Sequence, residues 1–153
     1  YVKDPYQDIG MIGDNTKENI QDGGGSLDFS SDPVEIFSGV LSTGEIERTT
    51  DFEDEVTLDS YTKVDDEEVK DRLRDDMAVV VNVEGYGLVL ISGCSHSGIV
   101  NIVKHSKRIS EDKEVRTVIG GLHLLDSDED RIRKVVNGLE DLGVERIIAG
   151  HCT

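Results

Sequence analysis

Three histidines occupy equivalent places in the second half of this 153-residue chain. Each lies in a short glycine-bearing segment that directly follows an apolar run: GCSHSG at 93–98, GGLHLL at 120–125 and GHCT at 150–153. His96, His123 and His151 are therefore separated by 27 and 28 residues. Neutral imidazole nitrogen is a common ligand of zinc, and neighbouring glycines let the backbone turn close to an ion. The pattern indicates a transition-metal site.

A histidine that follows a single strand is more often a hydrogen-bonded loop residue than a metal ligand. Three of them at matching positions favour a shared site over three separate structural roles. The fourth histidine, His105, falls within a predicted helix, and we expect it at the surface rather than in the site. The chain contains no HxH or CxxC motif. The three histidines could hold a metal alone, but we favour an upstream segment that supplies the remaining ligands.

The apolar runs before the histidines predict strands at 88–92, 115–119 and 144–149. Helices are predicted between them, one at 99–109 and one that ends at 142 and has Ser127 as its N-cap. Such alternation is typical of a parallel sheet with right-handed crossovers, so the fold class is α/β. Another run at 78–83, joined to 88–92 by a short glycine-containing loop, predicts a β-hairpin. Ligands of open parallel sheets bind beyond the carboxyl ends of the strands, where the three histidines lie.

The first half of the chain predicts a different organisation. Alternation of apolar and polar residues over 27–46 indicates antiparallel strands and tight turns. The charged stretch 49–76 predicts an exposed loop that ends in a short helix. The polar residues 1–31 predict no more than a turn or two of helix at 16–21, before the stop signal QDGGGS.

Charge and cysteine content exclude several classes of function. Residues 1–77 carry 7 basic and 22 acidic side chains, a net charge of −15, whereas residues 78–153 carry 9 and 11, a net charge of −2. This acidity opposes binding to nucleic acid or to an anionic membrane surface. Two cysteines form no disulfide framework in a chain of this length, and the absence of a signal-peptide pattern or a long apolar run favours the cytoplasm.

The motifs resemble those of a known family. LVLISGCSHSGIVN, VIGGLHLL and IIAGHCT, preceded by SGVLSTGEIERTTDFE and DDMAVVV, are similar to the metallo-β-lactamase-fold metal-dependent hydrolases. The resemblance is to the branch that includes the archaeal dihydropterin-methyl-ribofuranosylaminobenzene-phosphate synthase of methanopterin biosynthesis. It covers residues 33–153 and implies the later portion of an αββα sandwich. Residues 1–153 would then form a partial domain without the upstream HxHxDH segment of the superfamily.

The resemblance also implies roles for the histidines. His96 would complete a first metal position and His151 a second, for one or two ions of Zn²⁺ or another divalent transition metal. His123 stands where the family commonly has a bridging aspartate, and its loop offers no carboxylate before Asp126. It is therefore a candidate ligand, a neighbour of the ligands or a catalytic group that contacts substrate.

Other residues around these motifs have ordinary interpretations. Ser95 is expected to make loop hydrogen bonds rather than to act as a nucleophile. Cys94 and Cys152 are expected to be small packing residues near the site, with a thiolate ligand as the alternative. Asp75 and Asp76 are expected to cap a turn rather than to reach the rim of the site. The backbone N–H groups near Ser97 and Gly98 could face an anionic group. Glu45 and Arg48 could bind substrate or form an ion pair.

Together these features predict a metal-dependent hydrolase or pterin transferase that acts on a small, phosphorylated or pterin-like molecule. A metal ion would activate water or a diphosphate leaving group. We expect residues 1–153 alone to be inactive and to bind metal weakly. The alternative is a non-catalytic α/β binding domain whose histidines are structural or hold one regulatory metal. The oligomeric state does not follow from the sequence.

Overall fold

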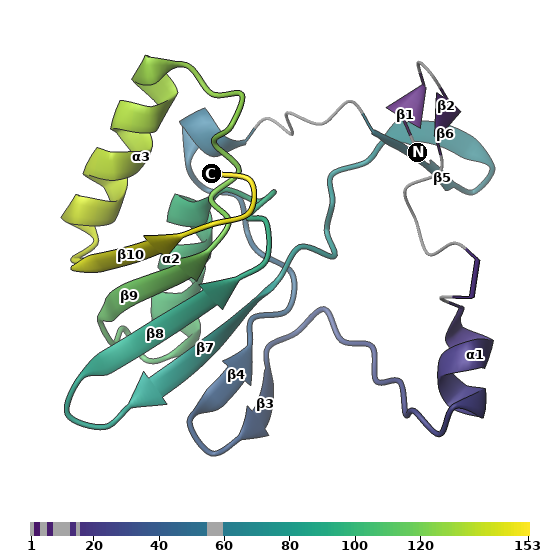
Figure 1. Cartoon of the computed structure of the whole chain (residues 1–153), viewed down its shortest axis with the longest axis horizontal. Helices are drawn as coiled ribbons and strands as arrows, with labels where there is room; N and C mark the ends of the chain where they lie inside the picture. The colour runs from purple at the N-terminus through teal and green to yellow at the C-terminus, as the bar shows by residue number, and fades with distance from the viewer. Residues whose placement is uncertain (1, 4–5, 8–12, 15, 55–59) are drawn as a thin grey trace. The chain divides into compact units, whose positions relative to one another are not determined.

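A computed structural model describes residues 2–3, 6–7, 13–14, 16–54 and 60–153 of the chain (Figure 1). The chain divides into two compact units. The first comprises Tyr1–Ser30 and Thr57–Arg72, and the second comprises Ser31–Val56 and Leu73–Thr153. All candidate site residues belong to the second unit.

The first unit contains short elements. Strands β1 (Val2–Lys3) and β2 (Tyr6–Gln7) pair antiparallel, and helix α1 (Lys17–Asp22) begins after Thr16, whose side chain accepts a 3.2 Å hydrogen bond from the Asn19 N–H. The helical turns predicted at 16–21 are thus confirmed.

The charged stretch of the first unit forms a hairpin instead of the predicted loop and short helix. Strands β5 (Tyr61–Val64) and β6 (Glu67–Lys70) pair antiparallel across a two-residue turn. Asp65 and Asp66 both have positive φ, 50° and 65°, as a type I′ turn requires. Aspartate tolerates this conformation better than most residues, which explains why a charged sequence folds here as a hairpin. Residues 55–59 of the stretch lie outside the described part.

The second unit is built on a six-stranded sheet in the order β10-β9-β8-β7-β4-β3. Its strands are β3 (Val34–Phe37), β4 (Val40–Ser42), β7 (Ala78–Val83), β8 (Gly87–Ser92), β9 (Val115–Gly120) and β10 (Arg146–Ala149). β3, β4, β7 and β8 pair antiparallel, while β8, β9 and β10 are parallel. The predicted hairpin, parallel strands and α/β class are confirmed.

Two helices, α2 (Ile99–Ile109) and α3 (Glu129–Asp141), cover one face of this sheet (Figure 1). Apolar residues of α2 recur at helical spacing and pack with residues of α3 and with alternate residues of β7 and β8 in one core; among them are Ile99, Ile102, Val103, Val135, Leu139, Val80 and Leu90. Helix α3 is capped by Asp128, which accepts a 2.8 Å hydrogen bond from the Arg131 N–H. The predicted cap, Ser127, is therefore wrong by one residue. A single 3₁₀ turn, η1 (Asp51–Glu53), precedes residues 55–59.

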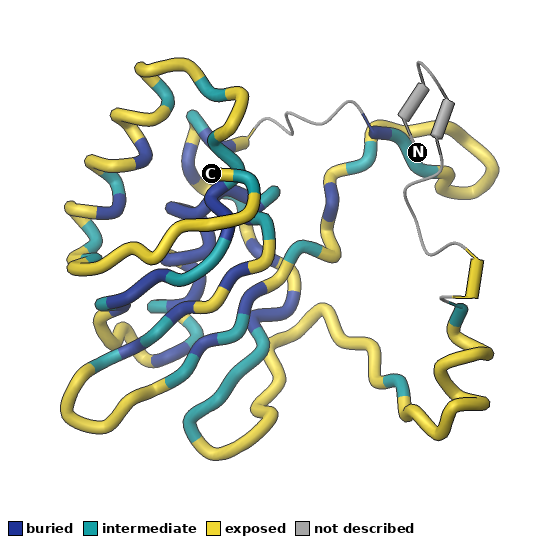
Figure 2. The backbone as a smooth tube through the Cα atoms, in the orientation of Figure 1, coloured by how far each residue is buried: buried dark blue, intermediate teal, exposed yellow. Residues whose placement is uncertain are grey.

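The opposite face of the sheet is also apolar. Successive strand residues point to opposite faces, so Val79 and Val81 of β7 lie away from the helices, paired with Ile91 and Val89 of β8. Val79, Val81 and Val89 are half-buried and Ile91 is 43% exposed. Buried residues alternate with less buried ones along much of β7 and β8 (Figure 2). Apolar residues on both faces are typical of a sheet that is covered on both sides. The helices in the described part are too short or too polar to cross a lipid bilayer.

Candidate metal centre

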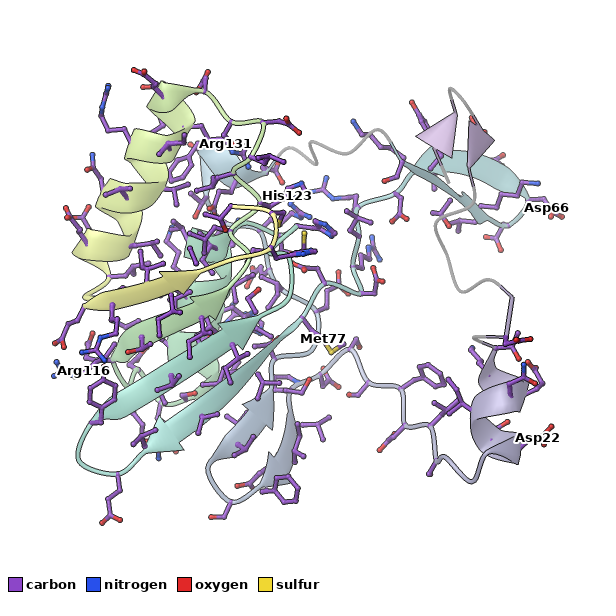
Figure 3. All side chains as sticks on the ribbon, in the orientation of Figure 1. Asp22, Asp66, Met77, Arg116, His123 and Arg131 are labelled. Carbon is purple, nitrogen blue, oxygen red and sulfur yellow. The ribbon has the colours of Figure 1, made fainter. Side chains whose placement is uncertain are left out.

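The loops that follow β8, β9 and β10 lie together at one edge of the sheet. The Gly121 N–H donates a 2.9 Å hydrogen bond to the Gly93 carbonyl, and the Leu124 N–H donates one of 3.0 Å to the Cys152 carbonyl. These bonds join the second loop to the first and to the third. The side chain of His123 accordingly lies beyond the carboxyl end of β9, at the edge where the neighbouring strands β8 and β10 also end (Figure 3).

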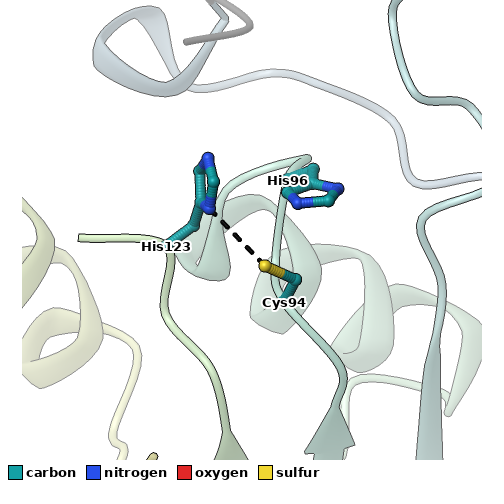
Figure 4. A group of neighbouring side chains, drawn as sticks. All are labelled: Cys94, His96 and His123. Carbon is teal, nitrogen blue, oxygen red and sulfur yellow. Dashed lines mark hydrogen bonds between the residues drawn. The ribbon is translucent and has the colours of Figure 1, made fainter. Parts of the chain in front are cut away.

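His96 and His123 are side by side. Their ring centroids are 4.7 Å apart, and the planes of the rings meet at 80°. Cys94 completes the group, with its Sγ atom 3.5 Å from Nδ1 of His123 (Figure 4). The ligand atoms of the three residues all lie within 4.8 Å of one another, and all three side chains are half-buried. Two of the three predicted histidines are thus brought together with a cysteine.

His151 belongs to a second group. Its ligand atom and those of Cys94 and Cys152 lie within 4.8 Å of one another, and the two sulfur atoms are 2.9 Å apart. His151 is exposed, while the two cysteines are half-buried. Cys94 belongs to both groups. The cysteines, which were expected to be packing residues near the site, therefore stand among its potential ligands.

The backbone at the site adopts conformations that are uncommon for residues other than glycine. Ser95, His123 and His151 have φ values of 64°, 51° and 59°. Left-handed conformations of this kind cost of order 1–3 kcal/mol each and persist where the surrounding structure imposes them. Gly120, before His123, has φ of 135°, and a Cβ atom there would lie 2.0 Å from the Ser92 carbonyl oxygen. Close loop packing therefore requires glycine at this position.

Ser95 makes the loop hydrogen bonds that were predicted for it. Its buried hydroxyl donates to the Gly121 carbonyl at 2.5 Å and lies 2.8 Å from the Ser92 hydroxyl. The side chain therefore links the loops after β8 and β9. A serine engaged in this way serves to fix the loop rather than to attack a substrate.

Asp76 reaches the loop that carries His96. Its Oδ2 atom accepts a 2.8 Å hydrogen bond from the Ser97 N–H, across 21 residues of chain. The expectation that this pair of aspartates caps a local turn is therefore wrong for Asp76. Through this hydrogen bond, the Asp76 side chain supports the backbone one residue after His96.

A second carboxylate, Glu53 of η1, is buried at the start of α2. It is 1% exposed, and its two oxygen atoms accept hydrogen bonds of 3.1 and 2.9 Å from the N–H groups of Val100 and Asn101. A Cβ atom on residue 98 would lie 2.4 Å from this carboxyl group, so the position of the Glu53 side chain requires glycine at 98. Burial raises the pKa of Glu53, and the hydrogen bonds from Asn101 and Val100 oppose that effect.

These two carboxylates exclude one sequence prediction. The N–H groups near Ser97 and Gly98 were candidates for binding an anionic group. The first donates to Asp76, and the second donates a 3.0 Å bond to the Ser95 carbonyl. The N–H groups of Val100 and Asn101 bind Glu53, so four N–H groups at the start of α2 already have protein acceptors. No local sequence signal identifies Glu53, whose partners lie 47 and 48 residues away.

Glu45 and Arg48 have separate partners. Glu45 lies 3.6 Å from the guanidinium of Arg74 in an exposed ion pair. Arg48 donates a 3.2 Å hydrogen bond to the backbone carbonyl of Glu53. The second contact connects the GEIER segment to the residue that caps α2.

His105 is buried, contrary to the prediction of a surface position. It is 7% exposed, with Nε2 at 3.1 Å from the Thr43 carbonyl and Nδ1 at 2.9 Å from the guanidinium of Arg108. Because guanidinium only donates, Nδ1 is the acceptor and Nε2 carries the proton. Burial lowers the pKa of His105 and favours this neutral form. The prediction that His105 lies outside the candidate site agrees with these contacts.

The electrostatics around His123 favour a neutral imidazole ring. Burial lowers the pKa of His123, and the nearby His96 lowers it further, while Asp76 and Asp126 act in the opposite direction. A neutral ring retains a nitrogen lone pair that can bind a metal. Burial and the neighbouring Cys152 thiol raise the pKa of Cys94 to about 12. Without a cation, Cys94 is therefore a protonated thiol.

The donor set fits a transition-metal ion. Bond lengths of about 2.0–2.1 Å to nitrogen and 2.3 Å to sulfur place two ligands of a tetrahedral zinc ion roughly 3.3–3.8 Å apart. The 3.5 Å between Cys94 Sγ and His123 Nδ1 lies in this range. Nitrogen and sulfur donors suit zinc and similar ions, whereas Mg²⁺ and Ca²⁺ prefer oxygen.

Comparisons with known proteins agree with this geometry. No family model matches the chain. The 7,8-dihydropterin-6-methyl-4-(β-D-ribofuranosyl)-aminobenzene-5′-phosphate synthase of Methanocaldococcus jannaschii is 39% identical over 146 residues, which cover 94% of this chain and 49% of the synthase. An uncharacterized protein of the same organism is 30% identical over 128 residues, 83% of this chain and 45% of that protein.

A solved structure decides the fold. The crystal structure of Tm1679, a metal-dependent hydrolase of the β-lactamase superfamily, matches with a TM-score of 0.69 and 34% identity. This chain has the metallo-β-lactamase fold. The match covers 84% of this chain and 48% of Tm1679, so the chain spans about half the length of the relatives it matches. The resemblance to this superfamily and to the synthase branch, predicted from the strand-end motifs, is confirmed.

Proposed function

We propose that the whole protein is a metal-dependent hydrolase or pterin transferase of the metallo-β-lactamase superfamily. The observation that carries this proposal is the group formed by Cys94, His96 and His123. Its ligand atoms lie within 4.8 Å of one another, at the ends of two adjacent parallel strands. The superfamily relatives named as a synthase and as a metal-dependent hydrolase support an enzyme rather than a binding domain.

We assign His96, His123 and His151 as metal ligands, with His123 also placed to contact substrate. A bound Zn²⁺ or similar ion would lower the pKa of a water molecule to about 7 or polarise an oxygen of a diphosphate leaving group. The protein supplies imidazole rings, held by loops whose hydrogen bonds to one another fix their spacing. Asp76 holds the backbone after His96, and Glu53 holds the helix that follows.

The proposed substrate is a small, phosphorylated molecule related to a pterin. The name of the synthase relative describes a product that joins a dihydropterin to a ribofuranosyl-aminobenzene phosphate. Because the start of α2 is occupied by Asp76 and Glu53, its N–H groups would not be the main site for the phosphate. A metal ion or residues outside this chain would take that role.

We further propose that residues 1–153 are part of a single αββα domain. The sheet has helices on one face and the apolar residues Val79, Val81, Val89 and Ile91 on the other. Since the relatives are about twice as long, the rest of the domain would cover this second face. Burial of this face would stabilise the whole domain through the hydrophobic effect.

The experiment uses the full-length protein. A chelator removes the metal, and activity is then assayed before and after addition of Zn²⁺, with a phosphodiester as one substrate and a dihydropterin diphosphate plus an aminobenzene riboside phosphate as the other. We expect metal-dependent turnover of one of them and its loss in His123→Ala. Stoichiometric metal binding without turnover of either substrate would favour the non-catalytic binding domain instead.

A further inference from the structure

We propose that Cys94 is a thiolate ligand of the ion held by His96 and His123, which makes the site selective for thiophilic ions such as Zn²⁺ and Co²⁺. This inference rests on the proposed metal-dependent function. It adds to it a sulfur ligand beside the histidines. Thiolate ligands select zinc-like ions, while oxygen ligands select Mg²⁺, Ca²⁺ and Mn²⁺.

The position of Cys94 is the first argument. Its sulfur belongs to both groups of potential ligands, one with His96 and His123 and the other with His151 and Cys152. It therefore lies between the histidine of the third loop and those of the first two. An ion bound by any of the three histidines would have this sulfur near it.

The distances between ligand atoms distinguish the roles of the two cysteines. Cys94 Sγ lies 3.5 Å from His123 Nδ1, the separation of two ligands on one tetrahedral ion. The sulfur atoms of Cys94 and Cys152 are 2.9 Å apart, whereas bonds of about 2.3 Å would place two thiolates of one zinc roughly 3.7–3.8 Å apart. Both sulfurs cannot bind the same ion in this arrangement.

Cys152 has a different role. Its thiol lies 3.4 Å from the Cys94 carbonyl and 2.9 Å from the Cys94 sulfur, so it can donate a hydrogen bond to either acceptor. A residue that acts through such a bond positions a ligand without binding the ion. The assignment therefore names Cys94 as the ligand and Cys152 as a positioning residue.

Charge provides a further argument. Within the ligand groups of the described residues the other donors are three imidazoles, which carry no charge when they bind a metal, and Cys152. The exposed Asp126 is the first carboxylate after His123 in its loop, and the nearby Asp76 already accepts the Ser97 N–H. A Cys94 thiolate would supply negative charge directly beside a divalent cation.

The experiment is Co²⁺ substitution of the full-length protein, followed by absorption spectroscopy and equilibrium dialysis of Cys94→Ser and Cys152→Ser. Wild type and Cys152→Ser should show a near-ultraviolet sulfur-to-cobalt charge-transfer band, and Cys94→Ser should lack it. We expect Cys94→Ser to weaken metal binding by more than about 100-fold, beyond the range of residues that act only by hydrogen bonding to a ligand. Cys152→Ser should weaken it by about 10- to 100-fold.

X-ray absorption of the zinc form of wild type tests the same assignment without a variant. One sulfur neighbour at about 2.3 Å is expected, together with nitrogen neighbours. Bound Co²⁺ or Zn²⁺ with only nitrogen and oxygen neighbours would overturn the Cys94 assignment and leave the proposed function standing. A charge-transfer band lost in Cys152→Ser and kept in Cys94→Ser would also overturn it. Failure of wild type to bind either ion would contradict the proposed function itself.

Discussion

The two ends of the parallel strands β8, β9 and β10 are built from different kinds of side chain. Beyond the carboxyl ends lie two half-buried imidazoles, one exposed imidazole and two half-buried thiols, on loops that bind one another through the backbone. At the opposite end, partly exposed ion pairs join Lys107 to Glu114 and Arg116 to Glu145. Arg116 lies at the opposite end of the strands from His123 (Figure 3).

We expect the carboxyl ends to serve function and the ion pairs at the opposite end to make a small contribution to stability. Exposed ion pairs contribute about 0–1 kcal/mol and are screened by salt. Three non-glycine residues at the carboxyl ends, Ser95, His123 and His151, have positive φ, and so do Glu111 and Asp112 in the turn before β9 at the opposite end. Backbone strain of this kind thus occurs at both ends, whereas in the described part of the chain the potential metal-ligand groups lie at the carboxyl ends. Substitutions at the two ends should therefore differ in size and in what they change.

Loss of the buried Glu53 should have the largest effect on stability. Glu53→Ala leaves the N–H groups of Val100 and Asn101 without their acceptors in a buried place, so we expect a loss of about 2–4 kcal/mol in the free energy of unfolding. Urea denaturation measures it. Asp51→Ala, at an exposed position of the same 3₁₀ turn, is the control and should change stability by less than about 0.5 kcal/mol. Equal losses in the two variants would contradict the capping role.

Asp76 should have a smaller effect that is specific to the His96 loop. Asp76→Asn weakens a charge-assisted hydrogen bond to the Ser97 N–H and should cost about 1 kcal/mol. Hydrogen exchange should speed up at Ser97. Its exposed neighbour provides the comparison, since Asp75→Asn should leave both quantities unchanged. If both variants behave alike, the contact does not support the loop.

His105 should make stability depend on pH. Its folded pKa lies below the ordinary value of 6.5, so the folded state resists protonation. The stability it contributes is present above pH 6.5 and is lost as the pH falls through the lowered pKa. The steepest slope for one group is about 1.4 kcal/mol per pH unit. We expect denaturation midpoints between pH 7 and 5 to fall less in His105→Gln than in wild type.

Two oppositely charged side chains, Arg108 and Glu47, act on the His105 ring. Arg108 opposes its protonation and Glu47 favours it, and the two also form an ion pair. Glu47→Gln should therefore lower the pKa of His105 further. An identical pH slope in wild type and His105→Gln would show that this histidine does not couple to folding.

The ion pairs at the opposite end should matter least. Glu114→Gln and Glu145→Gln remove exposed partners of Lys107 and Arg116, and each should change the free energy of unfolding by at most about 0.5 kcal/mol. Metal content of the full-length protein should not change. A loss above 2 kcal/mol in either variant would remove the contrast between the two ends.

Local and periodic signals made part of the fold predictable. The runs at 78–83 and 88–92 indicated the hairpin, and the spacing of apolar residues after Gly98 indicated α2. Glycine-bearing loops after successive strands placed His96 and His123 at one edge. The hairpin at 61–70 was missed because charged residues have low strand propensity, and the two-aspartate turn was not recognised as a hairpin signal.

The long-range contacts around the site and elsewhere in the second unit could not be predicted in the same way. Asp76 meets its partner across 21 residues, Glu53 across 47 and 48, and His105 across 62. Such contacts depend on how strands and helices pack, and no repeat or motif announces them. The two cysteines were visible beside the histidines in the sequence, but only the three-dimensional arrangement shows that one sulfur is shared by both groups.

Metal content of the full-length protein tests the central claim most directly. Wild type, His96→Ala, His123→Ala and His151→Ala would be dialysed against Zn²⁺, and bound metal would be measured by elemental analysis. His105→Gln serves as the control for loss of an imidazole outside the site. We predict a sharp loss of metal in the three strand-end variants and wild-type content in the control. Equal metal content in all five proteins would contradict the assignment of these histidines to a metal site.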